Sequence, residues 1–408
     1  MTAATPSGQN TMDEAAPIAP RPVVKTNDHN AAVDTLRGLA AAMVVVFHME
    51  FWGFFIVPGE VAFLGALGVN LFFTLSGFLI ARAVLVPPAF DRLKYLRNRS
   101  LRILPNYFIC CFLTLFIVNG NTISHATPGG LLFDLGMHAV LMHGWFASIA
   151  NSITGPLWTL SHEWIFYLLI GCTAPLLRSR RGWVLPLAMC AIAIAGKYLV
   201  MGKIWTPSTH RLNPLCHWDQ FGLGIIGALF SLASTGWKRR KLWTWLAAIA
   251  GVIVVGGCFY RQYATAVEFA AANFAEGYGS RTKGLGNNYA AEFYRKRSNV
   301  IWFPFVFSAG VSMVLIAVTG GFQRLNLWLA KTPLPWMGKV SYSTYLYHMA
   351  VLLCLARGFS SAKPGELFSS RGVASVVALI GIYAVSAFFF HFFEKPWLER
   401  KSALRQVK

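Results

Sequence analysis

The sequence predicts an all-α integral membrane protein with about ten transmembrane helices and one additional re-entrant or interfacial segment. The chain has 408 residues, of which 55% are hydrophobic and only 13% are charged, whereas soluble domains carry about a quarter of charged residues. Its apolar residues form runs long enough to cross a bilayer as helices. Its basic residues gather in short connections between these runs, as the positive-inside rule describes.

The same connections explain the formal net charge of +20 at pH 7. In a soluble protein such a charge would indicate a nucleic-acid partner. Here the basic residues follow the ends of the apolar runs, so we expect membrane lipids around the chain and no nucleic acid.

Ten apolar runs have the length of a membrane span: 35–56, 62–85, 102–119, 156–177, 182–201, 214–234, 242–260, 299–319, 339–356 and 373–393. An eleventh run, 129–148, is interrupted by polar residues. The basic clusters around Arg102 and Arg178 are both expected in the cytoplasm. An even number of crossings must separate them, so we interpret 129–148 as a re-entrant or surface-lying segment.

This topology places both termini in the cytoplasm. Residues 1–33 are rich in small residues, proline and polar groups and lack the apolar centre of a signal peptide. They predict a flexible cytoplasmic tail before a membrane domain at 34–398. Residues 399–408 predict a basic cytoplasmic tail, and the connection at 261–298 is expected on the outer side.

Two ionisable residues in the first run, Arg37 and His48, predict a functional site inside the membrane. Charged residues are rare in spans and usually serve a function. Eleven residues advance a helix by about three turns, which leaves the two side chains within roughly 20° and about 16 Å apart along the axis.

Arg99 and Arg102 form a second candidate group at a cytoplasmic boundary. They are three residues apart and share one helical face, and arginine is suited to binding phosphate. A carrier such as coenzyme A would need such a site, although basic residues at this depth also bind lipid headgroups.

Glu163 lies within the first turns of the run 156–177, where an unpaired carboxylate would be costly. We expect His48 to be its partner, because the carboxylate would stabilise the protonated imidazole. Ser161 and His162 precede Glu163, but adjacent helical residues point about 100° apart, which excludes a triad. His348 is expected to be a hydrogen-bonded core residue.

Together these segments resemble the acyltransferase-3 family of integral membrane acyltransferases, whose members modify bacterial surface glycans and related molecules. The resemblance extends from Asp34 to Trp397. It rests on the following motifs in family order: Arg37-x10-His48, Gly68-Val-Asn-Leu-Phe-Phe with Ser76-Gly77-Phe78, Arg99-x-x-Arg102-Ile-x-Pro105, Leu157-Trp-Thr-Leu-Ser-x-Glu163-Trp, Ser341-Tyr with Tyr345-Leu-Tyr-His348, and Glu394-Lys-Pro. Asn70 and His162 depart from the residues common in the family.

The resemblance implies an O-acyltransferase of the bacterial inner membrane that uses acetyl-CoA, or another acyl-CoA, and no metal. Its acceptor would be a hydroxyl group of a polysaccharide, such as an exopolysaccharide or lipopolysaccharide, or of a lipid-linked glycan precursor. In this hypothesis Arg37, Arg99 and Arg102 bind the donor phosphates. His48, assisted by Glu163, deprotonates the acceptor hydroxyl.

Three alternatives remain open at this point. A non-enzymatic membrane receptor or sensor would need neither a paired base nor a phosphate site. A multi-span transporter or flippase would also carry intramembrane Arg, His and Glu, although such proteins favour inverted repeats, and no convincing repeat is visible. Within the enzyme hypothesis, the acyl group could be succinyl or longer, and the acceptor a small lipid or a macrolide.

Overall fold

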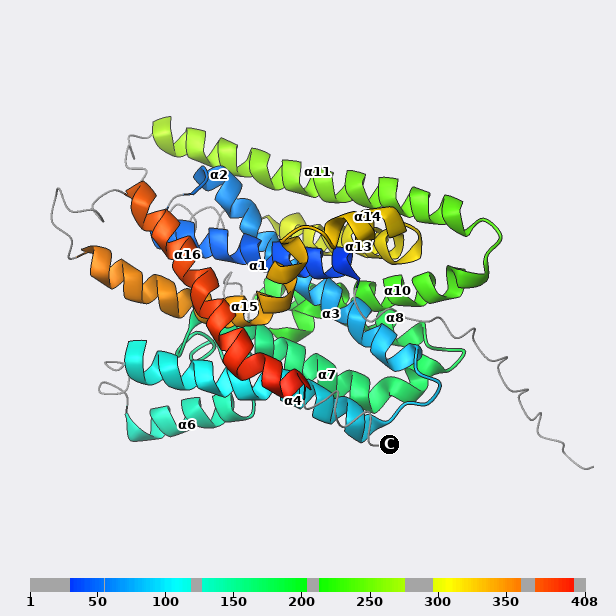
Figure 1. Ribbon diagram of the computed structural model, residues 1–408, viewed down its shortest axis with the longest axis horizontal. Helices are drawn as coiled ribbons and strands as arrows, with labels where there is room; N and C mark the ends of the chain where they lie inside the picture. The colour runs from blue at the N-terminus through cyan, green and yellow to red at the C-terminus, as the bar shows by residue number, and fades with distance from the viewer. Residues whose placement is uncertain are drawn as a thin grey trace, which may run out of the picture.

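In the computed structural model the described part of the chain, residues 30–54, 56–118, 127–203, 213–275, 296–360 and 371–399, contains helices and no strand (Figure 1). The all-α prediction is therefore confirmed over these residues. The predicted tails lie outside the described residues, apart from the residues nearest the membrane domain. Residues 276–295 of the outer connection predicted at 261–298 also lie outside them.

A long helix corresponds to each predicted span. These helices are α1 (Ala31–Phe51), α3 (Leu67–Leu85), α4 (Arg92–Leu113), α7 (Trp158–Arg178), α8 (Val184–Lys203), α10 (Trp218–Ala233), α11 (Arg240–Ala275), α13 (Arg297–Gly320), α15 (Leu334–Ser360) and α16 (Arg371–Phe389). Three shorter α-helices, α2 (Gly59–Ala62), α6 (Pro128–Ala139) and α14 (Gln323–Leu329), connect or flank them.

Six segments of the described chain are long and apolar enough to cross a membrane on their own composition: Ala31–Phe51, Gly59–Leu85, Gly155–Arg178, Arg240–Ala271, Ser298–Gly320 and Gly372–Glu399. The helices α4, α8, α10 and α15 are outside this group. The first turns of α4 are basic, and α10 has only 16 residues. Several apolar helices thus make this a membrane protein.

The segment 129–148 does not form a spanning helix. Its helix α6 has 12 residues, which is about 18 Å and well short of a hydrocarbon core of about 30 Å. The chain then continues through turns and the short 3-10 helix His143–Trp145. Apolar side chains such as Leu132 and Val140 are exposed on this segment, as a segment in contact with lipid would require.

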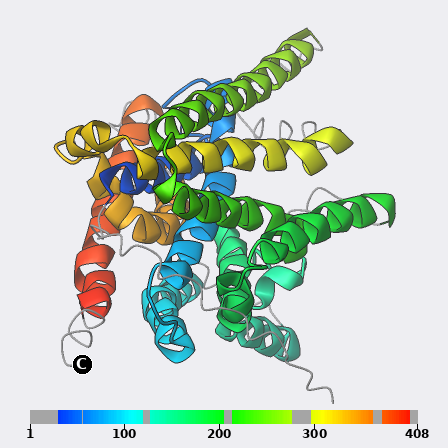
Figure 2. The same cartoon turned by 90° about the vertical axis from the view of Figure 1, so that its right-hand side faces the viewer.

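Helix α11 is longer than the predicted span at 242–260. It continues to Ala275, which corresponds to about 54 Å of helix. Residues 261–275 are rich in alanine, a strong helix former, so the helix persists beyond the apolar run. The predicted outer connection at 261–298 therefore begins as helix rather than loop. Figure 2 shows α11 beside α13 at one side of the bundle.

The helices α1 and α15 pack side by side and run in the same direction. Near their starts Gly38 faces Gly338, and a Cβ atom added to Gly38 would lie 2.8 Å from the Gly338 nitrogen. Small residues of this kind allow two membrane helices to approach closely. Ten or more residues further along, His48 faces His348.

Contacts between other neighbouring helices show which pairs run in the same direction and which run in opposite directions. Parallel pairs are α4 with α15 (Ile103 with Tyr342, Cys110 with Leu346) and α3 with α7 (Ser76 with Glu163, Val84 with Arg178). Antiparallel pairs are α11 with α13 (Thr244 with Gly320, Arg261 with Asn299) and α15 with α16 and its extension (Val351 with Gly381, Ser343 with Glu394).

Candidate active site

A pocket with about 810 Å³ of empty space, part of it open to solvent, lies between α1, α3, α4, α7 and α15. Four of the five predicted site residues line it: Arg37, Arg99, Arg102 and Glu163. The rest of the wall is largely apolar and aromatic. The fifth predicted residue, His48, is not among the lining residues.

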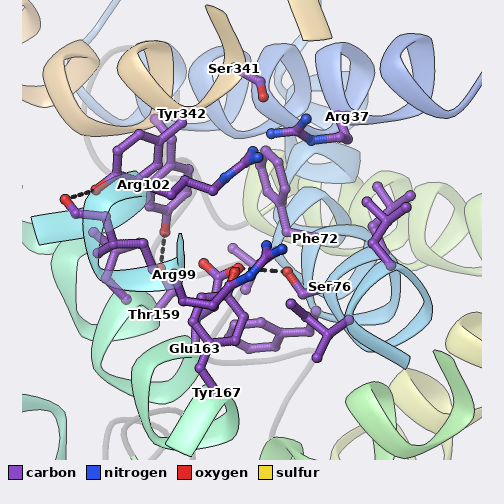
Figure 3. Close-up of a pocket in the computed structure, with 18 residues that line it drawn as sticks. Arg37, Phe72, Ser76, Arg99, Arg102, Thr159, Glu163, Tyr167, Ser341 and Tyr342 are labelled. Atoms are coloured by element: carbon purple, nitrogen blue, oxygen red, sulfur yellow. Dashed lines mark hydrogen bonds between the residues drawn. The ribbon is translucent and has the colours of Figure 1, made fainter. Parts of the chain in front are cut away.

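The arginines converge on the pocket from two helices. Figure 3 shows the guanidinium groups of Arg37 and Arg102 pointing toward the same space, with that of Arg99 on its opposite side. Arg37 also lies 3.8 Å from the carboxylate of Asp34 on its own helix. A pocket with several fixed positive charges and an apolar wall is suited to an anion that carries an apolar chain.

Local packing fixes the position of Arg99. Helix α4 begins at the N-cap Asp91, whose carboxylate accepts a hydrogen bond from the Lys94 backbone nitrogen at 2.9 Å. The Arg99 guanidinium lies over the rings of Tyr95 and Tyr167, at 5.9 and 5.7 Å from their centroids. These cation–π contacts hold the charge at the pocket wall.

Glu163 does not pair with His48, so this expectation is wrong. Its Oε1 atom accepts a hydrogen bond from Ser76 Oγ at 2.7 Å and another from the Tyr167 hydroxyl. The carboxylate thus faces the arginine side of the pocket (Figure 3).

The reason lies in the depth at which α7 begins. The hydroxyl group of Tyr345, near the middle of α15, donates to the Pro156 carbonyl at 3.0 Å and lies 2.6 Å from Thr159 Oγ1. The start of α7 therefore lies inside the bundle rather than at its outer surface. The depth of this end of α7 could not be inferred from the sequence, because it depends on residues 127–157, which form a short helix and turns that cover it.

His48 instead pairs with His348. The Nδ1 atom of His48 lies 3.1 Å from Nε2 of His348 and 2.9 Å from the Val44 carbonyl oxygen. His348 is fully buried, and its Nδ1 atom contacts the carbonyl oxygens of Thr344 and Tyr345. The prediction that His348 is a hydrogen-bonded core residue is confirmed. Its contact with His48 was missed, although the two residues lie at similar depths in two parallel spans.

Tyr345 connects the pocket to the two histidines. Its side chain lines the pocket beside Phe72, with ring centroids 5.6 Å apart. The same ring lies near the ring of His348, at a centroid distance of 5.9 Å. His348, and through it His48, thus contacts a side chain that lines the arginine pocket, although neither histidine lines the pocket itself.

Glu394 supplies a second acidic group close to the arginines. It is buried, accepts a hydrogen bond from Ser343 Oγ at 2.7 Å, and interacts electrostatically with Arg102 and Arg37. The arginines are therefore balanced by carboxylates on α7 and on the π-helix Phe390–Glu394 that continues α16, which makes a cluster of buried charges tolerable.

A separate imidazole pair lies at α6. The rings of His138 and His143 stack with centroids 3.9 Å apart, and Asp134 contacts His138 Nδ1 at 2.9 Å. Burial, and secondarily His138, lowers the pKa of His143 to about 3. In the described part of the chain, no group of three or more His, Cys, Asp or Glu residues is placed to hold a metal ion.

The sequence matches one family model and is similar to two named proteins. The acyltransferase-3 family model, described as an acyltransferase domain, matches residues 30–391. A Komagataeibacter xylinus protein whose name describes it as a membrane-bound transacylase, BcsY, is 26% identical over 332 residues, 78% of this chain and 71% of that protein. A protein of Acidianus two-tailed virus, whose name describes it as an acetyltransferase, ORF330, is 25% identical over 228 residues, 56% of this chain and 64% of that protein. No solved structure matches.

Proposed function

Because the chain belongs to the acyltransferase-3 family and is a membrane acyltransferase, we propose the following reaction for it. It transfers an acyl group, in the first instance acetyl, from a cytoplasmic acyl-CoA to a hydroxyl group of a cell-surface polysaccharide or its lipid-linked precursor. The observation that carries this proposal is the convergence of Arg37, Arg99 and Arg102 on one pocket with an apolar wall.

The pocket matches the chemistry of an acyl-CoA. The donor carries several phosphate groups at one end, which guanidinium groups bind through charge-assisted hydrogen bonds. Its pantetheine arm is long and largely uncharged, as the wall formed by Val69, Phe72 and Leu79 requires. Arg37 and His48 are separated by about 16 Å of helix, which is of the order of that arm.

His48 acts as the general base of the transfer in this proposal. It removes the proton of the acceptor hydroxyl while the oxygen attacks the thioester carbonyl, a contribution of typically about 10²–10⁴-fold. Glu163 orients Tyr167 and Ser76 and balances the arginine charge, rather than assisting His48. Direct transfer is the simplest route, because no activated serine or cysteine nucleophile is visible in the sequence.

The directions of packed helices support an even number of crossings, ten, with both termini on the same side of the membrane, which the basic connections assign to the cytoplasm. In a chain that crosses ten times, odd-numbered spans share one direction and even-numbered spans the other. The parallel pairs α1/α15 and α4/α15 join odd spans, and the parallel pair α3/α7 joins even spans. The antiparallel pairs join odd with even spans. In the proposed topology Arg37, Arg99 and Arg102 lie toward the cytoplasmic side of a bacterial inner membrane.

Surface-glycan analysis tests the proposal. A strain without this protein should lose O-acetyl signals from its extracted polysaccharide in a proton NMR spectrum. Wild-type protein should restore them, whereas an equally abundant His48→Ala variant should not. O-acetyl content that is unchanged by the deletion, with loss of an acylated lipid or small molecule, would move the acceptor to that class. Restoration by His48→Ala would remove the base assignment.

A further inference from the structure

The imidazole of His48 has a specific neighbour across the α1/α15 interface. The two helices are in close contact at Gly38 and Gly338, and the rings of His48 and His348 meet further along, with centroids 5.0 Å apart. Their nearest nitrogens, His48 Nδ1 and His348 Nε2, are 3.1 Å apart, which is a hydrogen-bond distance.

Backbone carbonyls determine which nitrogen of each ring carries the proton. A carbonyl oxygen only accepts, so the contacts of His348 Nδ1 with the oxygens of Tyr345 (2.9 Å) and Thr344 (3.1 Å) require a proton on Nδ1. In a neutral ring Nε2 is then an acceptor. The contact of His48 Nδ1 with the Val44 oxygen likewise requires a proton on His48 Nδ1. The two assignments are compatible: His48 Nδ1 donates and His348 Nε2 accepts.

From this geometry we infer that His348 is the positioning residue of the base: together with the Val44 carbonyl, it holds the His48 ring in the orientation and the tautomer in which Nε2 carries the lone pair. The inference rests on the proposed role of His48 as the general base. A base held by a third group is the common arrangement in acyl transfer. Here a neutral imidazole would take the place that a carboxylate often occupies, and Glu163 is bonded elsewhere.

The proton balance of the step involves His48 alone. The acceptor hydroxyl gives its proton to His48 Nε2 as its oxygen bonds to the thioester carbonyl carbon. The carbon–sulfur bond then breaks, and the departing thiolate of coenzyme A takes that proton. His348 neither gains nor loses a proton. Its Nε2 atom accepts a hydrogen bond that becomes charge-assisted while His48 is protonated, which stabilises the transition state more than the ground state.

The structure also provides a matched pair of substitutions. Glutamine at 348 can place an amide oxygen near the position of the imidazole Nε2, whereas the shorter asparagine reaches only the position of Nδ1. Both amides are neutral and can bond to the Tyr345 carbonyl. Only His348→Gln keeps an acceptor for His48.

The test is the rate of transfer from radiolabelled acetyl-CoA to the lipid-linked glycans of host membrane vesicles that contain each variant at equal abundance. His348→Asn should lower the maximal rate by roughly ten- to a hundredfold and change the KM for acetyl-CoA by less than about twofold. His348→Gln should retain most of the rate. If the asparagine variant does not accumulate, His348→Leu, which fills the space without an acceptor, should show the same loss.

Equal rates in the Asn and Gln variants, or a full rate in His348→Asn or His348→Leu, would overturn the positioning role. His48→Ala separates this result from a failure of the proposed function. An inactive His48→Ala protein beside a fully active His348→Asn protein would contradict only the role of His348. An active His48→Ala protein would contradict the base assignment itself, and the role of His348 with it.

Discussion

Gly338 of α15 lies directly against the backbone of Asp34 in α1, so closely that a Cβ atom at position 338 would overlap the Asp34 carbonyl oxygen. A side chain at this position must therefore push the two helices apart. These helices carry Arg37, His48 and His348, so the contact sets the alignment of the pocket with the two imidazoles.

Substitution of Gly338 by alanine should destabilise the protein, because overpacking a tight contact typically costs about 1–3 kcal/mol. The thermal unfolding midpoint of the detergent-solubilised protein should fall, and transfer from acetyl-CoA should fall with it. Gly358, on the same helix, is the matched control. A Cβ atom there meets no atom within 4 Å, so Gly358→Ala should be neutral or stabilising by about 0.5–1 kcal/mol. Equal effects of the two substitutions would contradict the role of this contact.

Glu163 is the negative charge of an otherwise positive pocket, and its removal should strengthen donor binding. Glu163→Gln keeps an oxygen that accepts from Ser76 and Tyr167 but no longer repels phosphate. Coenzyme A should bind more tightly by about 1 kcal/mol, roughly fivefold, in a calorimetric titration. Ser76→Ala removes a hydrogen bond but leaves the charge, so it should lower stability without tightening the binding. Weaker binding by Glu163→Gln would show that the carboxylate contacts the donor favourably.

The buried ring of His143 should make stability depend on pH. Burial lowers its pKa from 6.5 to about 3, so the unfolded chain takes up a proton that the folded chain does not. The stabilisation is fully present above pH 6.5 and is lost as the pH falls toward 3, by up to about 1.4 kcal/mol per pH unit.

The unfolding midpoint of the wild-type protein should therefore fall between pH 7 and pH 5. His143→Phe keeps an aromatic ring to stack on His138 but does not titrate, so its midpoint should fall less over the same range. Identical pH dependence in the two proteins would exclude His143 as a source of the effect.

Much of the fold follows from the sequence, because the length of an apolar run and the placement of basic residues are local properties. The run 35–56 and the helix Ala31–Phe51 agree closely, and the polar residues of 129–148 marked a segment that does not span. The end of α11 was misjudged, since alanine-rich sequence continues a helix after its apolar character has ended.

The site could be predicted only in part. The sequence identified four of the residues that line the pocket, because a charge in or beside an apolar run is conspicuous. They are Arg37, Arg99, Arg102 and Glu163. The predicted pairing of Glu163 with His48 was wrong, because the depth of α7 depends on tertiary contacts such as that of Tyr345 with Pro156. The contact between His48 and His348 joins residues 300 positions apart, and only the packing of α1 on α15 reveals it.

Calorimetric titration of the purified protein with coenzyme A tests most directly whether the arginine pocket binds an acyl-CoA. Arg102 lines the pocket, whereas Arg97 is exposed on the same helix. Both residues carry one positive charge, so both contribute equally to the positive-inside signal of this connection. Arg102→Gln should weaken binding about tenfold or more, since a hydrogen bond to a charged group contributes about 1.5–3 kcal/mol. Arg97→Gln should stay within about twofold of the wild type. Equal affinities in all three proteins, or an equal loss in both variants, would show that the arginine pocket is not the donor site.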